Sequence, residues 1–139
     1  CLLSRGLGDV YKRQVIDGVP KYLPALSKAQ KIQKKASKVG FDWDNAEQVF
    51  DKIYEELDEL KVEIERKDKE KMKDELGDVL FSIVNIARFL DIDATEALEG
   101  TIKKFDKRFR YVEQNCDIEK TSLENLEKLW QNAKKAIDL

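Results

Sequence analysis

The strongest constraint on the fold is a pair of acidic clusters, each with the spacing of a helix. The first is Glu55-Glu56-Leu57-Asp58-Glu59, and the second is Glu75-Leu76-Gly77-Asp78. Residues three or four positions apart lie on one face of a helix. The connection around 67–71 is short, which predicts that the two helices run antiparallel with their acidic clusters facing each other. Carboxylates that converge between packed helices repel, and a bound divalent cation would remove that repulsion.

The second of these helices, expected over 70–90, is apolar around most of its circumference. Its apolar residues are Met72, Leu76, Val79, Leu80, Phe81, Ile83, Val84, Ile86, Ala87, Phe89 and Leu90. One polar strip interrupts them: Glu75, Asp78, Ser82 and Asn85. Buried carboxylates without partners cost several kcal/mol, so the strip requires a cation, a basic partner or protonation. A glycine inside this helix, Gly77, predicts a close approach of another helix.

The first acidic helix, expected over 45–66, carries Glu56, Glu59 and Glu63 along one flank of a narrow apolar stripe. The stripe consists of Val49, Ile53, Leu57, Leu60 and Ile64. The alternative interpretation of such acids is a solvated charged face. We favour that interpretation for four of them: Glu55, Asp58, Glu63 and Glu65.

Composition narrows the chemistry of any site. The chain has 139 residues, 39% of them charged, with a net charge of −2, two cysteines and no histidine. The absence of histidine excludes a histidine base, a histidine-ligated zinc and a Glu-x-x-His di-iron site. Carboxylates select hard cations, so we expect Mg²⁺, with Mn²⁺ as the alternative. The net charge gives no basic field for nucleic acid, and no apolar run reaches transmembrane length, so we expect a cytoplasmic protein without a membrane partner.

The rest of the chain completes an all-α architecture. Residues 1–14 fit no periodicity, and we expect them to be a leader unrelated to the domain over 15–139. Further helices are expected from Pro24 to Gly40, over 94–115 and over 121–137. The result is a bundle of about five helices. Because one helix is apolar nearly all round, we expect a homodimer that completes a four-helix core, with the site near the interface.

Basic residues on the later helices could hold an anion. Lys104 and Arg108 are four residues apart beside an apolar stripe, and Trp130 and Lys134 repeat that spacing. From the same helical projection we expect three other basic residues to point elsewhere: Lys103, Lys107 and Arg110. Ordinary surface charges and a core tryptophan are the alternative interpretations.

Five ordered blocks resemble a known family. Glu55-Glu56-x-x-Glu59 followed by Glu75-x-x-Asp78 resembles the signature of the all-α nucleoside triphosphate pyrophosphohydrolases. The surrounding sequence resembles the catalytic domain of the MazG family over about residues 17–137. Its blocks are LPALSKAQKIQKKASKVGFDW, EELDEL, ELGDVLFSIVNIARFL, KKFDKRFRYVE and LEKLWQNAKK.

The resemblance implies hydrolysis of a nucleoside triphosphate to the monophosphate and pyrophosphate. It implies that the metal ligands are Glu56, Glu59, Glu75 and Asp78, with Glu55 in a supporting role. It also implies triphosphate binding by Lys104 and Arg108, and nucleotide contacts by Trp130 and Lys134. Asn85 falls in a matching block, and we include it among the substrate-binding residues. The water-activating base would be Glu59 or Glu56, which the sequence does not separate.

Two alternatives remain open from the sequence. A related pyrophosphatase would have a narrower substrate, such as dUTP, dCTP or phosphoribosyl-ATP. A non-catalytic helical interaction domain would place the acids on its surface and use its apolar stripes for a partner.

Overall fold

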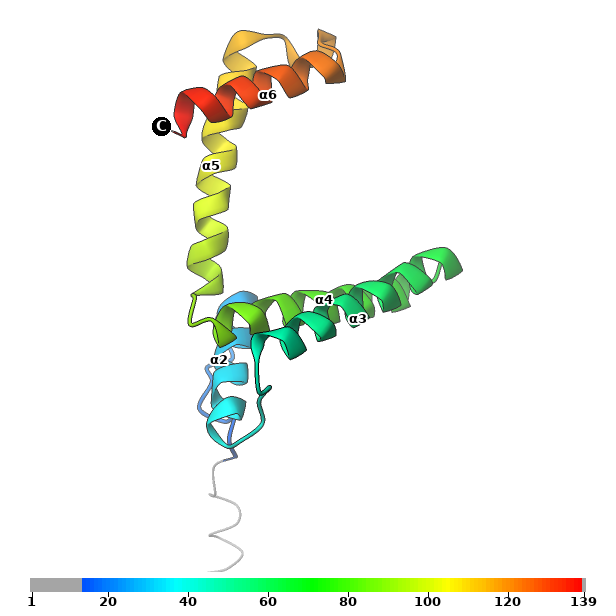
Figure 1. Ribbon diagram of the computed structural model, residues 1–139, viewed down its shortest axis with the longest axis vertical. Coiled ribbons are helices and arrows are strands. Elements are labelled where there is room, and N and C mark those ends of the chain that lie inside the picture. The colour runs from blue at the N-terminus through cyan, green and yellow to red at the C-terminus, as the bar shows by residue number, and fades with distance from the viewer. Residues whose placement is uncertain (1–13, 139) are drawn as a thin grey trace, which may run out of the picture. The chain divides into compact units, whose positions relative to one another are not determined.

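The structure is a computed structural model that describes residues 14–138. Its elements, in chain order, are α2 (Ala25–Lys38), α3 (Ala46–Arg66), α4 (Lys69–Phe89), α5 (Ala94–Asn115), the 3₁₀ helix η1 (Ile118–Lys120) and α6 (Leu123–Ile137) (Figure 1). The described residues contain helices and no strand, which confirms the all-α expectation. The expected leader at 1–14 lies outside the described residues except for Gln14. None of the described helices is both long enough and apolar enough to span a membrane.

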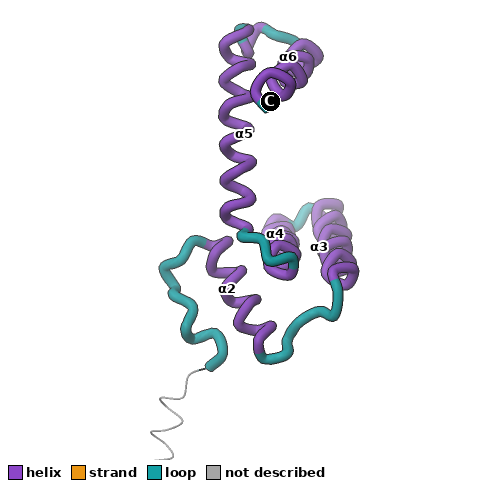
Figure 2. The backbone as a smooth tube through the Cα atoms, turned by 60° about the vertical axis from the view of Figure 1, so that its left-hand side comes forward, coloured by secondary structure: helices purple, strands orange, loops and turns teal. Residues whose placement is uncertain are grey.

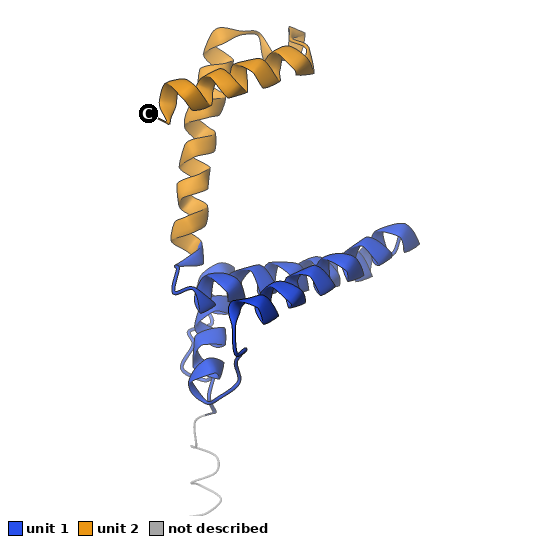
Figure 3. Cartoon of the chain, viewed as in Figure 1, with its two compact units in different colours: residues 1–94 blue, residues 95–139 orange. Residues whose placement is uncertain are grey.

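The chain divides into two compact units, the first ending at Ala94 and the second beginning at Thr95 (Figure 3). The first unit contains α2, α3 and α4, and the second contains α5, η1 and α6. The acidic clusters therefore belong to the first unit, and the basic residues of α5 and α6 belong to the second.

The antiparallel pair α3–α4 is the centre of the first unit (Figures 1 and 2). Asn45 caps α3 by accepting a hydrogen bond from the Gln48 backbone amide at 3.0 Å. Only Lys67 and Asp68 connect the helices: Lys67 adopts a left-handed conformation with φ 57°, and the Asp68 side chain caps α4. A connection this short forces the chain to reverse, so the predicted antiparallel arrangement is confirmed.

Helix α2 packs against α4 and ends in a glycine turn. The Gly40 amide donates to the Ser37 carbonyl at 3.1 Å, and the Phe41 amide donates to the Ala36 carbonyl, also at 3.1 Å. These two bonds form a Schellman motif, which needs a left-handed residue at its turn. Gly40 has φ 93°, a conformation that glycine adopts without steric cost. The motif directs the Phe41–Trp43 loop back toward α4.

The single chain buries less of α4 than the sequence predicts. Val79 and Val84 are buried, but four large apolar residues of α4 remain exposed: Leu76, Leu80, Phe81 and Ile83. On α3, Leu57 and Ile64 are also exposed, whereas Val49 and Ile53 are buried. The helices that one chain packs against α4 cover only part of its circumference. The close approach expected at Gly77 is not found among the described residues, where a Cβ atom at this position would have no neighbour within 4 Å.

In the second unit, η1 connects α5 to α6, and α6 lies across α5 (Figure 1). Ser122 caps α6 by accepting from the Asn125 amide at 3.2 Å, so the helix begins two residues later than expected. The Trp130 ring contacts that of Phe105 with centroids 5.3 Å apart, and Val112 and Ala133 are buried.

Candidate active site

Three carboxylates from the two acidic clusters converge between α3 and α4. Glu56, Glu75 and Asp78 each offer an oxygen atom, and these three atoms lie within 4.8 Å of one another. Glu56 is 6% exposed, Glu75 is half-buried and Asp78 is exposed. The i,i+3 spacing on α4 and the antiparallel pairing with α3 produce this arrangement. The cluster therefore opens to solvent on the side of Asp78.

Two buried carboxylate oxygens of this cluster have no hydrogen-bond partner among the described residues. Oε2 of Glu56 and Oε2 of Glu75 are both buried without a hydrogen bond. Because the donors are all carboxylate oxygens, the set fits a hard divalent cation such as Mg²⁺. Glu56, Glu75 and Asp78 are the residues that would hold it.

Electrostatic repulsion within the cluster is visible in its pKa values. Burial, together with the hydrogen bond that protonated Glu75 donates to Glu59 and the charges of the nearby acids, raises the pKa of Glu75 to about 7. Burial and the charge of Glu56 also raise the pKa of Asp78. Both shifts indicate that the site resists carrying all its negative charges at once.

One cation of the chain already partners the cluster. Nζ of Lys52 lies 2.8 Å from Oε1 of Glu56 and 3.4 Å from Oε1 of Glu55. The hydrogen bond with Glu56 is the main reason that the pKa of Lys52 is raised. Lys52 was not predicted from the sequence, although its position four residues before Glu56 was a usable signal.

The other acids on α3 divide between partners and solvent. Glu59 is exposed and shares a hydrogen bond with Glu75. Glu55 is also exposed, and its Oε1 forms an ion pair with Lys52. Glu63 was expected to face water, and that expectation is wrong. It is 8% exposed, its Oε1 binds Arg66 at 3.1 Å, and its Oε2 is buried without a partner. The two-residue connection holds the ends of α3 and α4 close together, which covers this side chain.

Asn85, the last member of the polar strip on α4, lies in a different setting. Its Oδ1 accepts from Nε and from one terminal nitrogen of Arg88, at 3.1 and 2.8 Å. Arg88 also donates two bonds to Asp42, at 2.9 and 2.7 Å, and this pairing lowers the pKa of Asp42. Asn85 lines a pocket of about 330 Å³ between α2, the loop 40–43 and α4. The pairing of Asp42 with Arg88 was not predicted from the sequence, because 46 residues separate them.

In the second unit, Lys104 and Arg108 line a pocket of about 300 Å³. Its lining residues are Lys103, Lys104, Lys107, Arg108, Ile137 and Asp138. Lys103 and Lys107 were expected to point elsewhere, and their place in this lining corrects that expectation. Nε of Arg108 donates to Asp138 at 3.2 Å, and its guanidinium lies 5.8 Å from the centre of the Trp130 ring. The charges of Arg108, Lys104 and Lys134 lower the pKa of Asp138, with the Arg108 hydrogen bond the largest cause.

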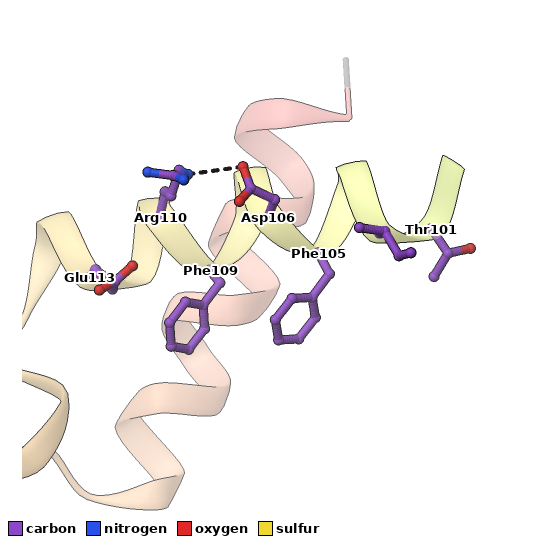
Figure 4. Close-up of a pocket in the computed structure, with 7 residues that line it drawn as sticks. Thr101, Phe105, Asp106, Phe109, Arg110 and Glu113 are labelled. Carbon is purple, nitrogen blue, oxygen red and sulfur yellow. Dashed lines mark hydrogen bonds and ion pairs between the residues drawn. The ribbon is translucent and has the colours of Figure 1, made fainter. Parts of the chain in front are cut away.

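The opposite side of α5 is apolar and concave. A pocket of about 490 Å³ is lined there by Ile102, Phe105 and Phe109, among others. Figure 4 shows the two phenyl rings pointing to the same side of the helix, apart from the paired Asp106 and Arg110. The remaining lining residues are Thr101, Asp106, Arg110 and Glu113, and Arg110 is paired with Asp106 at 2.9 Å.

A family model agrees with the acidic site. The model of the MazG nucleotide pyrophosphohydrolase domain matches residues 44–113. The chain belongs to the MazG family. The match covers α3, α4 and nearly all of α5, and so includes both acidic clusters, Lys104 and Arg108.

Curated relatives extend the MazG similarity over most of the chain. A nucleoside triphosphate pyrophosphohydrolase of Escherichia coli K12 is 42% identical over 136 residues, which are 92% of this chain and 52% of that protein. The nucleoside triphosphate pyrophosphohydrolase/pyrophosphatase MazG of Thermotoga maritima is 45% identical over 117 residues, 81% of this chain and 45% of that protein. Uncharacterized protein YabN of Bacillus subtilis is 46% identical over 126 residues, 86% of this chain and 26% of that protein. The chain spans about half the length of the first two relatives.

Proposed function

We propose that this MazG domain is a Mg²⁺-dependent hydrolase that cleaves nucleoside triphosphates between the α and β phosphates. The products are the nucleoside monophosphate and pyrophosphate. Two of the curated relatives are named as nucleoside triphosphate pyrophosphohydrolases, which supports the reaction class. The family resemblance supplies the position of cleavage.

The observation that carries this proposal is the convergence of Glu56, Glu75 and Asp78 within 4.8 Å. A purely structural acid cluster would be expected to pair each buried oxygen, because an unpaired buried carboxylate is destabilising. Here two buried oxygens lack a partner among the described residues, and Lys52 pairs with Oε1 of Glu56 and not with its Oε2. A function that requires a cation explains why this arrangement is retained.

The proposed chemistry needs no covalent nucleophile. A divalent cation held by the cluster would offset polyphosphate charge and lower the pKa of a water molecule. The oxygen of the water would form a bond to one phosphorus atom of the phosphoanhydride as the bond from that phosphorus to the bridging oxygen breaks. The bridging oxygen would leave with the other product. The proton that the water loses passes to a carboxylate, for which Glu59 is the candidate because it is exposed and reaches Glu75. Glu56 is the alternative base, and Glu55 supports the site through Lys52.

We assign the triphosphate contacts to the basic pocket of the second unit. Lys104 and Arg108 line one pocket, and Arg108 already holds the Asp138 carboxylate there. A carboxylate that accepts two bonds from a guanidinium resembles a phosphate in charge and geometry. Trp130 and Lys134 lie around the same group, with Trp130 beneath the guanidinium and Lys134 close enough to affect the pKa of Asp138.

The test is pyrophosphate release from a panel of ribonucleoside and deoxyribonucleoside triphosphates, with Mg²⁺, with Mn²⁺ and with a chelator. Glu59→Gln and Glu75→Gln should abolish release while the circular dichroism spectrum stays helical. Asp58→Asn is the matched control, because Asp58 is exposed on α3 beside Glu59 and outside the cluster. This control should keep full turnover.

Each other outcome identifies an alternative. Release from dUTP, dCTP or phosphoribosyl-ATP alone would establish the related enzyme with a narrower substrate. No release from any nucleotide, together with no thermal shift by Mg²⁺ or Mn²⁺, would overturn the proposal in favour of an interaction domain. Unchanged turnover in Glu59→Gln would remove Glu59 from the mechanism.

A further inference from the structure

An acidic residue lies inside the basic pocket of the second unit. Four of the residues that line this pocket are basic, namely Lys103, Lys104, Lys107 and Arg108, and one is acidic, Asp138. Oδ1 of Asp138 accepts from Nε of Arg108 at 3.2 Å, and Oδ2 accepts from Nη2 of the same guanidinium. The carboxylate therefore occupies one whole edge of Arg108 in a pocket whose other charged lining residues are all cations.

The edge of Arg108 that Asp138 occupies is also suited to a phosphate. Two parallel N–H donors of a guanidinium match two oxygens of a carboxylate or of a phosphate. The guanidinium lies 5.8 Å from the centre of the Trp130 ring, and the Arg108 side chain is 16% exposed. Because Arg108 is enclosed to this extent and shares the pocket with Asp138, a phosphate that enters meets the edge that Asp138 already holds.

Asp138 is negatively charged at neutral pH. The hydrogen bond from Arg108 is the main reason that the pKa of Asp138 lies below its ordinary value, and the charges of Arg108, Lys104 and Lys134 act in the same direction. A polyphosphate in the pocket would lie beside this carboxylate, and like charges at such a site repel. Movement of the carboxylate into solvent relieves that repulsion, so displacement of Asp138 is favoured over shared binding of Arg108.

The position of Asp138 in the fold allows this displacement. Asp138 is the C-cap of α6, and its backbone amide donates to the Lys134 carbonyl at 3.1 Å. Its side chain is 35% exposed. Rotation about the side-chain bonds would move the carboxylate into solvent and leave this backbone hydrogen bond intact. An ion pair with a partner exposed to this extent is weak, so a polyanion that contacts several cations at once can replace it.

We propose that Asp138 is a displaceable internal counter-ion, which occupies the polyphosphate pocket until substrate binds and returns to Arg108 as pyrophosphate leaves. The inference rests on the proposed function, which assigns the triphosphate to this pocket. Asp138 competes with substrate and product alike, so it weakens the binding of both and favours the release of pyrophosphate. No covalent bond forms or breaks in this exchange.

The first test is calorimetric titration of inorganic tripolyphosphate into the full chain without metal. In the absence of a cation the acidic cluster of the first unit repels a polyanion, so the titration reports on basic residues. Asp138→Asn preserves the shape of the side chain and removes its charge. It should bind tripolyphosphate about two- to fivefold more tightly than the wild type, the range expected for loss of a partly exposed ion pair.

Three further variants connect this gain with the contact to Arg108. Asp138→Glu restores the charge and should bind about as weakly as the wild type. Asp106→Asn is the matched control, because it removes a carboxylate that pairs with Arg110 at 2.9 Å on the same helix, outside the basic pocket. It should bind as the wild type does. In an Arg108→Gln background, Asp138→Asn should give no gain, since the two residues then have no contact to lose.

Steady-state kinetics provide a readout that loss of a merely structural contact would move in the opposite direction. In Asp138→Asn both the KM for a nucleoside triphosphate and the inhibition constant for pyrophosphate should fall by the factor seen with tripolyphosphate. Weaker tripolyphosphate binding and a higher KM would overturn the proposal, because Asp138 would then position Arg108 for the phosphate. Equal affinities, or no binding by any of the proteins, would overturn it as well.

A second measurement uses the wild type alone and so does not depend on folding of the variants. The carboxyl carbon of Asp138 is followed by nuclear magnetic resonance over a pH series, with and without saturating tripolyphosphate. The pKa of Asp138 should rise to its ordinary value or above when the ligand is present, because Arg108 no longer holds the carboxylate. A pKa that stays lowered would overturn the displacement.

The two proposals fail in different ways. Pyrophosphate release from nucleotides, together with equal affinities and an unmoved pKa of Asp138, would overturn the counter-ion alone. Tighter tripolyphosphate binding in Asp138→Asn without release from any nucleotide would overturn the proposed function alone.

Discussion

Nζ of Lys52 lies 2.8 Å from Oε1 of Glu56, while Oε2 of the same carboxylate has no partner. The lysine and a bound dication would therefore share one carboxylate and repel each other. Lys52→Gln should lower the melting temperature of the metal-free protein, because the cluster loses its neutralising charge. The same change should increase the thermal shift produced by Mg²⁺, because the competing cation is gone. Differential scanning fluorimetry over a range of Mg²⁺ concentrations measures both effects.

Lys61→Gln is the control for this prediction, because Lys61 is an exposed lysine of the same helix. It should change neither quantity. A smaller Mg²⁺ shift in Lys52→Gln would mean that the lysine assists cation binding rather than competing with it.

Glu75 is the acid of the cluster that is most reluctant to ionise, with its pKa raised to about 7. A carboxyl group whose folded-state pKa exceeds its unfolded value loses its stabilising contribution as the pH rises through the folded value. At about pH 8 the metal-free protein should therefore become more stable in Glu75→Gln. The Mg²⁺ shift should largely disappear in this variant, because one of the three ligand atoms is replaced by an amide.

Thermal melts at about pH 8, with and without Mg²⁺, test both parts of this prediction. Asp58→Asn removes a neighbouring charge outside the cluster and should leave the Mg²⁺ shift intact. Retention of the full shift in Glu75→Gln would exclude Glu75 from the cation site.

Asp42 and Arg88 form a two-bond ion pair across the first unit, and the pKa of Asp42 is lowered by it. The pKa shift of Asp42 is opposite in sign to that of Glu75. The stability from this pair is present above the unfolded pKa of 3.8 and is lost as the pH falls through the lower folded value. Asp42→Asn should cost about 1–3 kcal/mol at neutral pH, because Arg88 is largely buried and loses its charged partner.

Urea unfolding at a series of acidic pH values measures this effect. The wild type and Asp42→Asn should converge in stability as the pH falls below the unfolded pKa of Asp42. Asp44→Asn is the control in the same loop and should follow the wild type. A constant difference between the wild type and Asp42→Asn throughout the acidic range would show that the contact does not depend on charge.

Local signals allowed much of the fold to be predicted. Apolar spacing combined with Asn45, Gly40 and Ser122 at helix ends placed the helices within about two residues of their observed bounds. The short connection at Lys67 and Asp68 also brought the two acidic clusters together, because a helical hairpin leaves little choice of pairing.

Contacts between distant segments were beyond the sequence. Arg88 meets Asp42, and Gln33 meets the Phe81 carbonyl, through tertiary packing of α2 against α4. Spacing alone does not encode such pairs. One trace of Gln33 was visible, since it follows Ala29 by four residues and precedes Ala36 by three, and so lies on the apolar face of a lysine-rich helix. The burial of Glu63 was missed for a different reason, because it depends on how the two-residue connection holds the ends of α3 and α4 together.

The final prediction concerns the apolar side of α4 that the single chain leaves uncovered. Leu76, Leu80 and Ile83 are 47%, 53% and 46% exposed, and their spacing places them on one face. Exposed apolar residues in a row are unfavourable in water and mark an interface. We expect the protein to sediment as a homodimer at micromolar concentration, with this face buried between the two copies.

Leu80→Glu should convert the dimer to monomers, because a carboxylate would have to be buried at the centre of that face. Lys73→Glu is the control, since Lys73 is exposed on the same helix and already polar. It should remain dimeric. Analytical ultracentrifugation of the three proteins distinguishes the outcomes. A monomeric wild type would contradict the homodimer, and a Leu80→Glu variant that stays dimeric would place the interface elsewhere.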